Sequence, residues 1–207
     1  MPSKVEGDFS KYPKEIQDIF PYVCGEVSNL RYNWDVYHDF FMEKREHTEL
    51  IGKHLGEMFG IFQNLLQDEI FLSVSRLTDK TDRKNKNVSL WAINSVLKHE
   101  KDPEFLEKVN KSIERIFSEV SDIRRHRSKR IAHYDHYVII ESTSLPIVKF
   151  KKIGEVIEMI ESHMNLFHWH YEETTVLYDA IDSTEPFLKV FDSIYKLEEL
   201  TFKKNGL

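Results

Sequence analysis

The sequence is poor in the residues that interrupt long helices. It has only 7 glycines and 6 prolines among 207 residues. An all-β sandwich or barrel needs closely spaced turns, and such turns are rich in glycine and proline. The scarcity therefore argues against an all-β fold and favours long helices with few connections.

Disulfides, long apolar runs and a general excess of positive charge are also missing. Cys24 is the single cysteine, so no internal disulfide can form. The first 17 residues lack the apolar stretch of a secretory signal, and no segment approaches the ~20 apolar residues of a membrane-spanning helix. We therefore expect a cytoplasmic protein without a membrane partner. The 35 acidic and 29 basic residues give a formal net charge of -6, so any site for nucleic acid must be local.

Enough apolar material is present for one folded core. Hydrophobic residues make up 41% of the chain and charged residues 31%. At ~100–200 residues per domain, the length is typical of one domain. We expect a single helical domain over residues 1–207, in which residues 185–207 form an accessory C-terminal helix.

Apolar residues recur three or four positions apart, the spacing of amphipathic helices. This spacing predicts helices over residues 19–43, 48–77, 103–131 and 152–181, a short helix after Asn87 or Ser89, and a final helix from Glu185 to about Leu200. Residues 137–150 are rich in β-branched residues and contain Pro146, a composition typical of a crossing loop or a short β-hairpin. The sequence thus predicts an all-α bundle of five or six helices.

The densest positive cluster is RRHRSKR, residues 124–130. Guanidinium groups match the geometry of phosphate oxygens, and imidazoles transfer protons near neutral pH, so the cluster predicts a phosphate-binding site. A basic last turn that stabilises the helix dipole is the alternative. The candidate phosphate or RNA ligands are Arg124, Arg125, His126 and Arg130, with Arg127 and Lys129 in the same run.

Three segments resemble a known family. RSKRIAHYD (residues 127–135) resembles the R-x(4–6)-H motif of the HEPN superfamily, with five residues between Arg127 and His133. FLSVSRLTDKT (residues 71–81) followed by NVSLWAI (residues 87–93) is similar to the AbiU-like, abortive-infection branch. The resemblance implies the helical HEPN bundle.

The resemblance also implies an activity. Many HEPN proteins are metal-independent endoribonucleases that dimerise and act as toxins or phage-defence effectors. It implies that Arg127 holds the scissile phosphate, that His133 is the general acid/base, and that no cofactor is needed. RNA, a second copy and a protein antitoxin such as a nucleotidyltransferase are the implied partners. Active members commonly carry Asn, Asp or His after the arginine, where this chain has Ser128. The alternative is a non-catalytic module that binds RNA, a nucleotide or a protein.

The motif spacing adds a geometric condition. Six residues along an ideal helix turn by about 600° and advance ~9 Å, which leaves Arg127 and His133 about 120° apart. Either the helix ends or bends between them, or a two-fold dimer places one copy's arginine opposite the other's histidine. We favour the dimer. Arg76 and Asp79 are candidate structural supports that tie residues 48–77 to the motif.

Other chemistries lack support in the sequence. His163, His168 and His170 do not share one helix face, and no HExxH or paired-cysteine pattern supplies metal ligands, so no metal site is expected. Walker A, dinucleotide-binding and G-x-S-x-G motifs are absent, which argues against nucleotide hydrolases and serine hydrolases.

Overall fold

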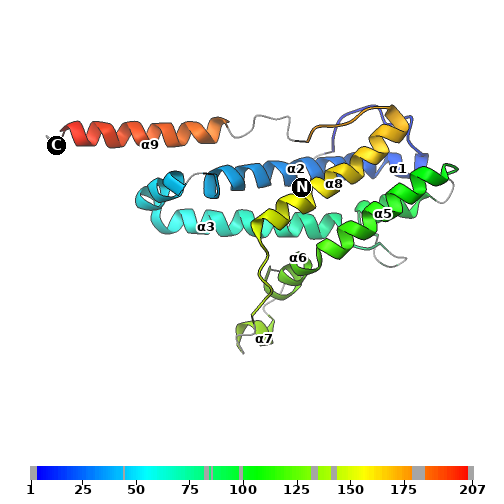
Figure 1. Ribbon diagram of the computed structural model, residues 1–207, viewed down its shortest axis with the longest axis horizontal. Helices are drawn as coiled ribbons and strands as arrows, with labels where there is room; N and C mark the ends of the chain where they lie inside the picture. Colours follow the sequence, from blue (N-terminus) through cyan, green and yellow to red (C-terminus); the bar gives the residue numbers. More distant parts are fainter. Residues whose placement is uncertain are drawn as a thin grey trace. The chain divides into compact units, whose positions relative to one another are not determined.

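The described part of the chain is all-α, as predicted. The computed structural model describes residues 4–43, 45–81, 84, 86–97, 100–131, 135–140, 144–178 and 185–204. Their helices are α1 Lys14–Gln17, α2 Phe20–Phe41, α3 Arg45–Leu77, α4 Leu90–Ser95, α5 Pro103–Glu119, α6 Ser121–His126, the π-helical segment η2 Arg127–Ile131, α7 His136–Ile139, α8 Phe150–Glu172 and α9 Glu185–Lys204 (Figure 1). No helix in these ranges is long and apolar enough to cross a membrane.

Local sequence explains where α4 and α5 begin. Ser89 caps α4, because its side chain accepts a hydrogen bond from the backbone N–H of Ala92. Asp102 caps α5 by accepting from the N–H groups of Glu104 and Phe105, and Pro103 follows at the first helical position. The helix predicted over residues 103–131 is interrupted at Val120, where ψ is 1°, and continues as α6 and η2.

The β-hairpin considered for residues 137–150 is not observed. Among its described residues there is no strand: α7 includes residues 137–139, and residues 144–149 have no regular structure. Pro146 has no N–H for a strand ladder, and its carbonyl oxygen lies 2.7 Å from His126 Nε2, so it is occupied by a side chain. Residues 141–143 lie outside the described residues.

The described residues form two compact units. Unit 1 comprises Met1–Arg31 and Asp68–Tyr178, and unit 2 comprises Tyr32–Gln67 and Asp179–Leu207, each as far as it is described. In unit 1, α5 and α8 pack side by side (Figure 1). Their fully buried aliphatic residues fill the core of this unit: Val109, Ile113, Ile116, Val156, Ile157 and Ile160. Every described candidate site residue belongs to unit 1.

Unit 2 has a smaller, aromatic core. Its buried residues are Val36, Phe40, Leu50, Phe59 and Phe191. Phe191 comes from α9 and lies 5.0 Å from Phe40 between ring centroids. Gly56 interrupts α3 with a φ of 49°, a conformation that costs glycine little because it has no Cβ.

An ion pair fixes α2 against α8 in unit 1. Arg31 donates from Nε and Nη2 to the two carboxylate oxygens of Glu161, at 2.5 and 2.6 Å. Both side chains are mostly buried, with 13% and 15% exposed. This two-point contact sets the register of the two helices, because a guanidinium and a carboxylate pair best when both are coplanar.

His163 makes the stability of the fold depend on pH. Its ring is fully buried on α8, and neither nitrogen has a hydrogen-bond partner among the described residues. Burial lowers its pKa from 6.5 to about 3. Between these two pKa values the unfolded chain binds a proton that the folded chain does not, so the free energy of unfolding falls as the pH falls below 6.5.

We therefore expect His163→Leu to lose less stability in acid than the wild type. Between pH 7.5 and 5.5 the contribution of His163 to the free energy of unfolding decreases by about 1.4 kcal/mol. The variant has no titrating group at this position and so lacks that decrease. Urea titrations at both pH values measure it. His38→Gln is the control, since the His38 side chain is 46% exposed, and it should behave like the wild type. An equal acid loss in His163→Leu and wild type would contradict this account.

Candidate phosphate-binding site beside α6

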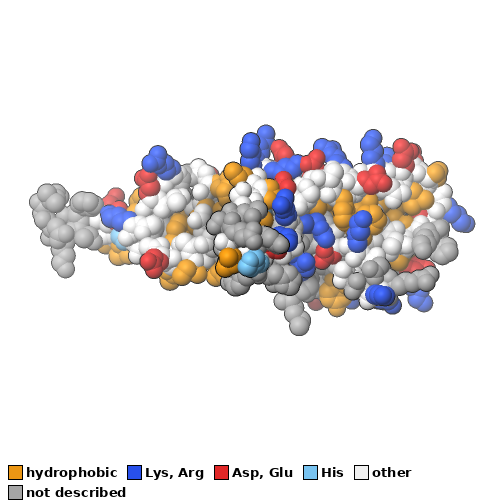
Figure 2. All heavy atoms as spheres, turned by 90° about the horizontal axis from the view of Figure 1, so that it is seen from below, with side chains coloured by type: hydrophobic (Ala, Val, Ile, Leu, Met, Phe, Trp, Pro, Cys, Tyr) orange, Lys and Arg blue, Asp and Glu red, His pale blue; other side chains and the backbone are white. Residues whose placement is uncertain are grey.

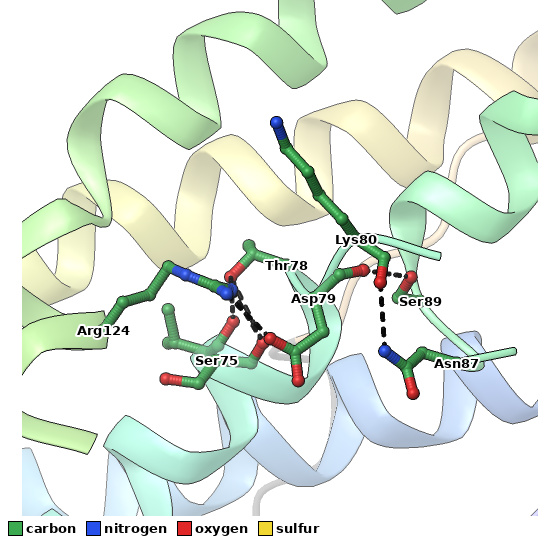
Figure 3. Close-up of polar contacts among 8 residues, drawn as sticks. Ser75, Thr78, Asp79, Lys80, Asn87, Ser89 and Arg124 are labelled. Atoms are coloured by element: carbon green, nitrogen blue, oxygen red, sulfur yellow. Dashed lines mark hydrogen bonds and ion pairs between the residues drawn. The ribbon is translucent and has the colours of Figure 1, made fainter. Parts of the chain in front are cut away.

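The two segments that resemble the AbiU-like branch are joined directly in the structure. The Ser89 hydroxyl donates to the backbone carbonyl of Asp79 at 2.7 Å. The Asn87 amide donates to the carbonyl of Lys80 at 3.0 Å (Figure 3). Asn and Ser satisfy the backbone groups left unpaired where α3 ends, which is their usual role beside helix termini. The end of α3 and the start of α4 therefore form one hydrogen-bonded corner.

Arg124 connects this corner to the motif helix. It reaches from α6 to the end of α3, where Nη2 donates to Asp79 Oδ1 at 2.8 Å (Figure 3). Nη1 donates to Thr78 Oγ1 at 3.1 Å and to the Ser75 carbonyl at 3.3 Å. Asp79 thus ties α3 to the segment that carries the R-x5-H motif.

Arg76 lies in a different set of contacts. Its Nε donates to Glu26 Oε1 on α2 at 2.8 Å, and its Nη2 donates to Glu69 Oε1 on the same helix at 2.6 Å. These contacts support the packing of α3 on α2. They do not reach α6.

Carboxylates partly neutralise the basic cluster. Arg130 pairs with Asp68 and Lys129 with Asp135, each at 2.5 Å, while Arg124 pairs with Asp79. In the part of the chain that the structure describes, no carboxylate pairs with Arg125 or Arg127. Lys and Arg side chains gather beside α6 and α7 on the face seen in Figure 2. The uncompensated positive charge of the cluster is therefore centred on Arg125 and Arg127.

A pocket lies beside these two arginines. It has a volume of about 260 Å³ and is lined by Ser75, Ser121, Arg124, Arg125, Arg127 and Ser128. The side chains of all six residues carry hydrogen-bond donors, three of them charged at every relevant pH. The pocket therefore has the positive charge and the hydrogen-bond donors to bind an anion.

Ser75 is one of two residues of this pocket, with Ser121, that were not predicted from the sequence. It is 1% exposed, and its hydroxyl has no hydrogen-bond partner among the described residues. Spacing offers a signal for it, because Phe71 and Ser75 are four residues apart on α3 and so share one helix face, and Asp79 follows four positions later, just after the helix ends. This part of α3 meets α6. The ring centroids of Phe71 and His126 are 5.5 Å apart, and Asp79 binds Arg124.

The backbone changes pitch at the motif arginine. Arg127 is the first residue of the π-helical η2, which has a wider turn than the α-helix before it. The ideal-helix geometry used above therefore does not extend beyond Arg127. His133 lies outside the described residues, as do its neighbours 132 and 134.

His126 makes contacts away from the pocket. Its Nε2 donates to the Pro146 carbonyl at 2.7 Å, and its ring meets the Phe71 ring edge to face. It therefore holds the segment before α8 against α6. It is not one of the residues that line the pocket.

Comparison with family models decides which family this geometry belongs to. The HEPN_AbiU2 model, described as AbiU2, matches residues 13–185. The chain belongs to the AbiU2 family of HEPN proteins. Neither the comparison with curated proteins nor that with solved structures found a match. The resemblance found in residues 71–135 is confirmed, and the family match extends over most of the helices around them.

The other reactive side chains of this AbiU2 chain have structural contacts. His168 Nδ1 lies 2.9 Å from the Tyr12 hydroxyl, and His170 stacks on Phe105 with ring centroids 3.8 Å apart. Burial raises the pKa of the Cys24 thiol to about 12, so it stays protonated and is a poor nucleophile. Among the residues described, no group of three or more His, Cys, Asp or Glu side chains is arranged to hold a metal ion.

Proposed function

We propose that this AbiU2 protein is a metal-independent endoribonuclease of the HEPN type that acts as a toxin or phage-defence effector. The pocket lined by three arginines and three serines carries the proposal, because it includes the motif residue Arg127. A transition state that concentrates negative charge on phosphorus-bound oxygens is stabilised by fixed donors of this kind.

The proposed reaction needs only groups on the protein and the RNA. His133 removes the proton of a 2′-hydroxyl, and that oxygen attacks the adjacent phosphorus. The bond to the 5′-oxygen breaks, the leaving oxygen takes up a proton, and the products carry a 2′,3′-cyclic phosphate and a 5′-hydroxyl. An imidazole with an ordinary pKa of ~6.5 suits both proton transfers near neutral pH. Arg127 stabilises the charge on phosphorus, and Arg124, Arg125 and Arg130 bind neighbouring phosphates.

Association with a second copy is part of the proposal. The part of α3 after Gly56 exposes the large apolar residues Met58, Ile61, Phe62 and Leu65, with 38% to 64% of each residue accessible. Several exposed apolar residues close together on one helix are typical of an interface. A two-fold dimer would also pair the arginine of one copy with the histidine of the other.

Mixed dimers test this pairing. We expect a purified dimer of one Arg127→Ala chain and one His133→Ala chain to regain about half of wild-type activity, because one of its two composite sites is intact. Each variant alone should be nearly inactive. Two tags on co-expressed chains isolate the mixed dimer, and light scattering verifies its size. No recovery in a verified mixed dimer would place both residues of each site in one chain.

A second candidate is a non-catalytic module that binds RNA through the same pocket. It is favoured by Ser128, which follows Arg127 and donates its hydroxyl to the Arg125 carbonyl at 3.2 Å. Incubating the wild type with a mixed RNA pool in excess EDTA separates the candidates. Cleavage supports the ribonuclease. RNA binding that weakens steeply with salt, without cleavage, supports the module.

A further inference from the structure

The pocket beside α6 offers donors and little else. The six described residues that line it are arginines and serines, and none of these is a carboxylate, an aromatic or an aliphatic residue. A nucleobase needs acceptors for its N–H groups, and the serine hydroxyls are the only side-chain acceptors among the described residues that line the pocket. The lining therefore suits a small anion rich in acceptor oxygens.

The size of the pocket supports the same ligand. At about 260 Å³ it lies below the ~300–1,000 Å³ of sites that enclose a whole small molecule. Taking ~30 Å³ for each water, it has room for roughly eight or nine waters. That space fits one phosphate group with its ester oxygen, or two linked phosphates.

Ser75 provides a second, independent observation. Its buried hydroxyl has no hydrogen-bond partner in the part of the chain that the structure describes, whereas the nearby hydroxyl of Thr78 donates to the Val74 carbonyl at 2.7 Å and that of Ser128 to the Arg125 carbonyl. Buried hydroxyls are almost always hydrogen-bonded, because an unpaired one loses its hydration without replacement. An acceptor oxygen in the pocket would satisfy Ser75.

Charge distinguishes between two kinds of phosphate. Asp79 offsets the charge of Arg124, so the positive charges of Arg125 and Arg127 remain uncompensated among the described residues. An internal phosphodiester carries one negative charge and has two free oxygens. A phosphate monoester carries about -1.5 to -2 at pH 7 and has three free acceptor oxygens. The monoester therefore matches the charge of these two arginines more closely than the diester does.

We propose that this pocket binds a terminal phosphate, as found at a phosphorylated RNA end or on a free nucleotide. If the proposed ribonuclease function holds, on which this extension rests, the pocket fixes an RNA end beside Arg127 and favours substrates with phosphorylated ends. The site is thereby distinct in its chemistry from a groove that binds any stretch of RNA backbone.

Three RNAs of one sequence test the proposal with the full-length wild-type chain. One carries a 5′-phosphate, one a 3′-phosphate, and one has hydroxyls at both ends. Fluorescence anisotropy should show at least tenfold tighter binding of one phosphorylated RNA than of the hydroxyl-ended RNA, the effect of roughly one charge-assisted hydrogen bond. A nucleoside monophosphate and inorganic phosphate serve as competitors. If the monophosphate competes as well as the phosphorylated RNA, the ligand is a free nucleotide; if it competes far more weakly, the ligand is an RNA end.

Substitutions in the pocket test whether it causes the preference for phosphorylated RNA ends. Ser75→Ala should reduce the preference for the phosphorylated end to within about threefold and leave binding of hydroxyl-ended RNA unchanged. Arg125→Gln should reduce the same preference and also weaken binding of hydroxyl-ended RNA. Ser118→Ala removes an exposed hydroxyl on α5 that donates to the Arg115 carbonyl and should keep the preference. Equal binding of all three RNAs by the wild type would overturn the terminal-phosphate proposal. Cleavage of hydroxyl-ended RNA is measured separately, so the ribonuclease proposal stands or fails on its own result.

Discussion

Arg127→Ala is expected to lower the rate of RNA cleavage roughly 100-fold or more, and His133→Ala to do the same. The first substitution removes fixed positive charge from the transition state, and the second removes the group that transfers the proton. Arg127 is partly exposed and has no carboxylate partner in the described part of the chain, so its loss should leave the fold intact. Single-turnover rates on one RNA give the effect, and circular dichroism verifies the fold.

The matched control for Arg127 is Arg115→Ala. Arg115 is an exposed cation on α5, but it does not line the pocket beside α6. Its loss changes the net charge by the same amount and should alter the cleavage rate less than about threefold. If all three variants cleave RNA like the wild type, the activity belongs to another site or to a contaminant.

Asp79→Ala is expected to reduce the free energy of unfolding by about 2–3 kcal/mol. The substitution leaves the Arg124 guanidinium without its carboxylate, although only 33% of the Arg124 side chain is exposed to water. It also loosens the link between α3 and α6, so cleavage should fall as well. Urea unfolding and cleavage assays on the same samples measure both effects.

Glu69→Ala is the control for Asp79. Glu69 also pairs with an arginine of α3, but 44% of its side chain is exposed, so its loss should cost less than about 1 kcal/mol. It should leave cleavage unchanged, since Arg76 does not reach α6. Equal costs for the two substitutions would show that Asp79 is an ordinary surface partner.

The long helices were predictable because amphipathic spacing is a local property. Residues 19–43 and 48–77 gave nearly the observed bounds of α2 and α3. The break in the helix at Val120 was not predictable from the sequence, since neither glycine nor proline marks it. Val120 itself is fully buried, as expected of a residue in a continuous helix. The helix α7 was missed because its β-branched residues favour strands, whereas the described residues of this fold contain no strand with which they could pair.

The site was predictable in its charges but not in its partners. The run of cations in residues 124–130 is visible in the sequence, and so is the motif spacing. The neutralisation of these cations is not visible in the sequence, because their carboxylate partners are far away along the chain. Asp68 pairs with Arg130, 62 residues later, and Asp79 pairs with Arg124, 45 residues later. Ser75 was missed for a related reason: a serine among apolar helical residues gives no indication that its hydroxyl is left unpaired beside three arginines.

The most direct test of metal-independent ribonuclease chemistry compares two substrates in excess EDTA. One is an RNA, and the other has the same sequence with every 2′-hydroxyl methylated. The account predicts that the wild type cuts only the unmodified RNA and leaves 2′,3′-cyclic phosphate and 5′-hydroxyl ends, because the 2′-oxygen is the nucleophile. Cleavage of the methylated substrate, or cleavage of RNA that EDTA abolishes, would contradict it.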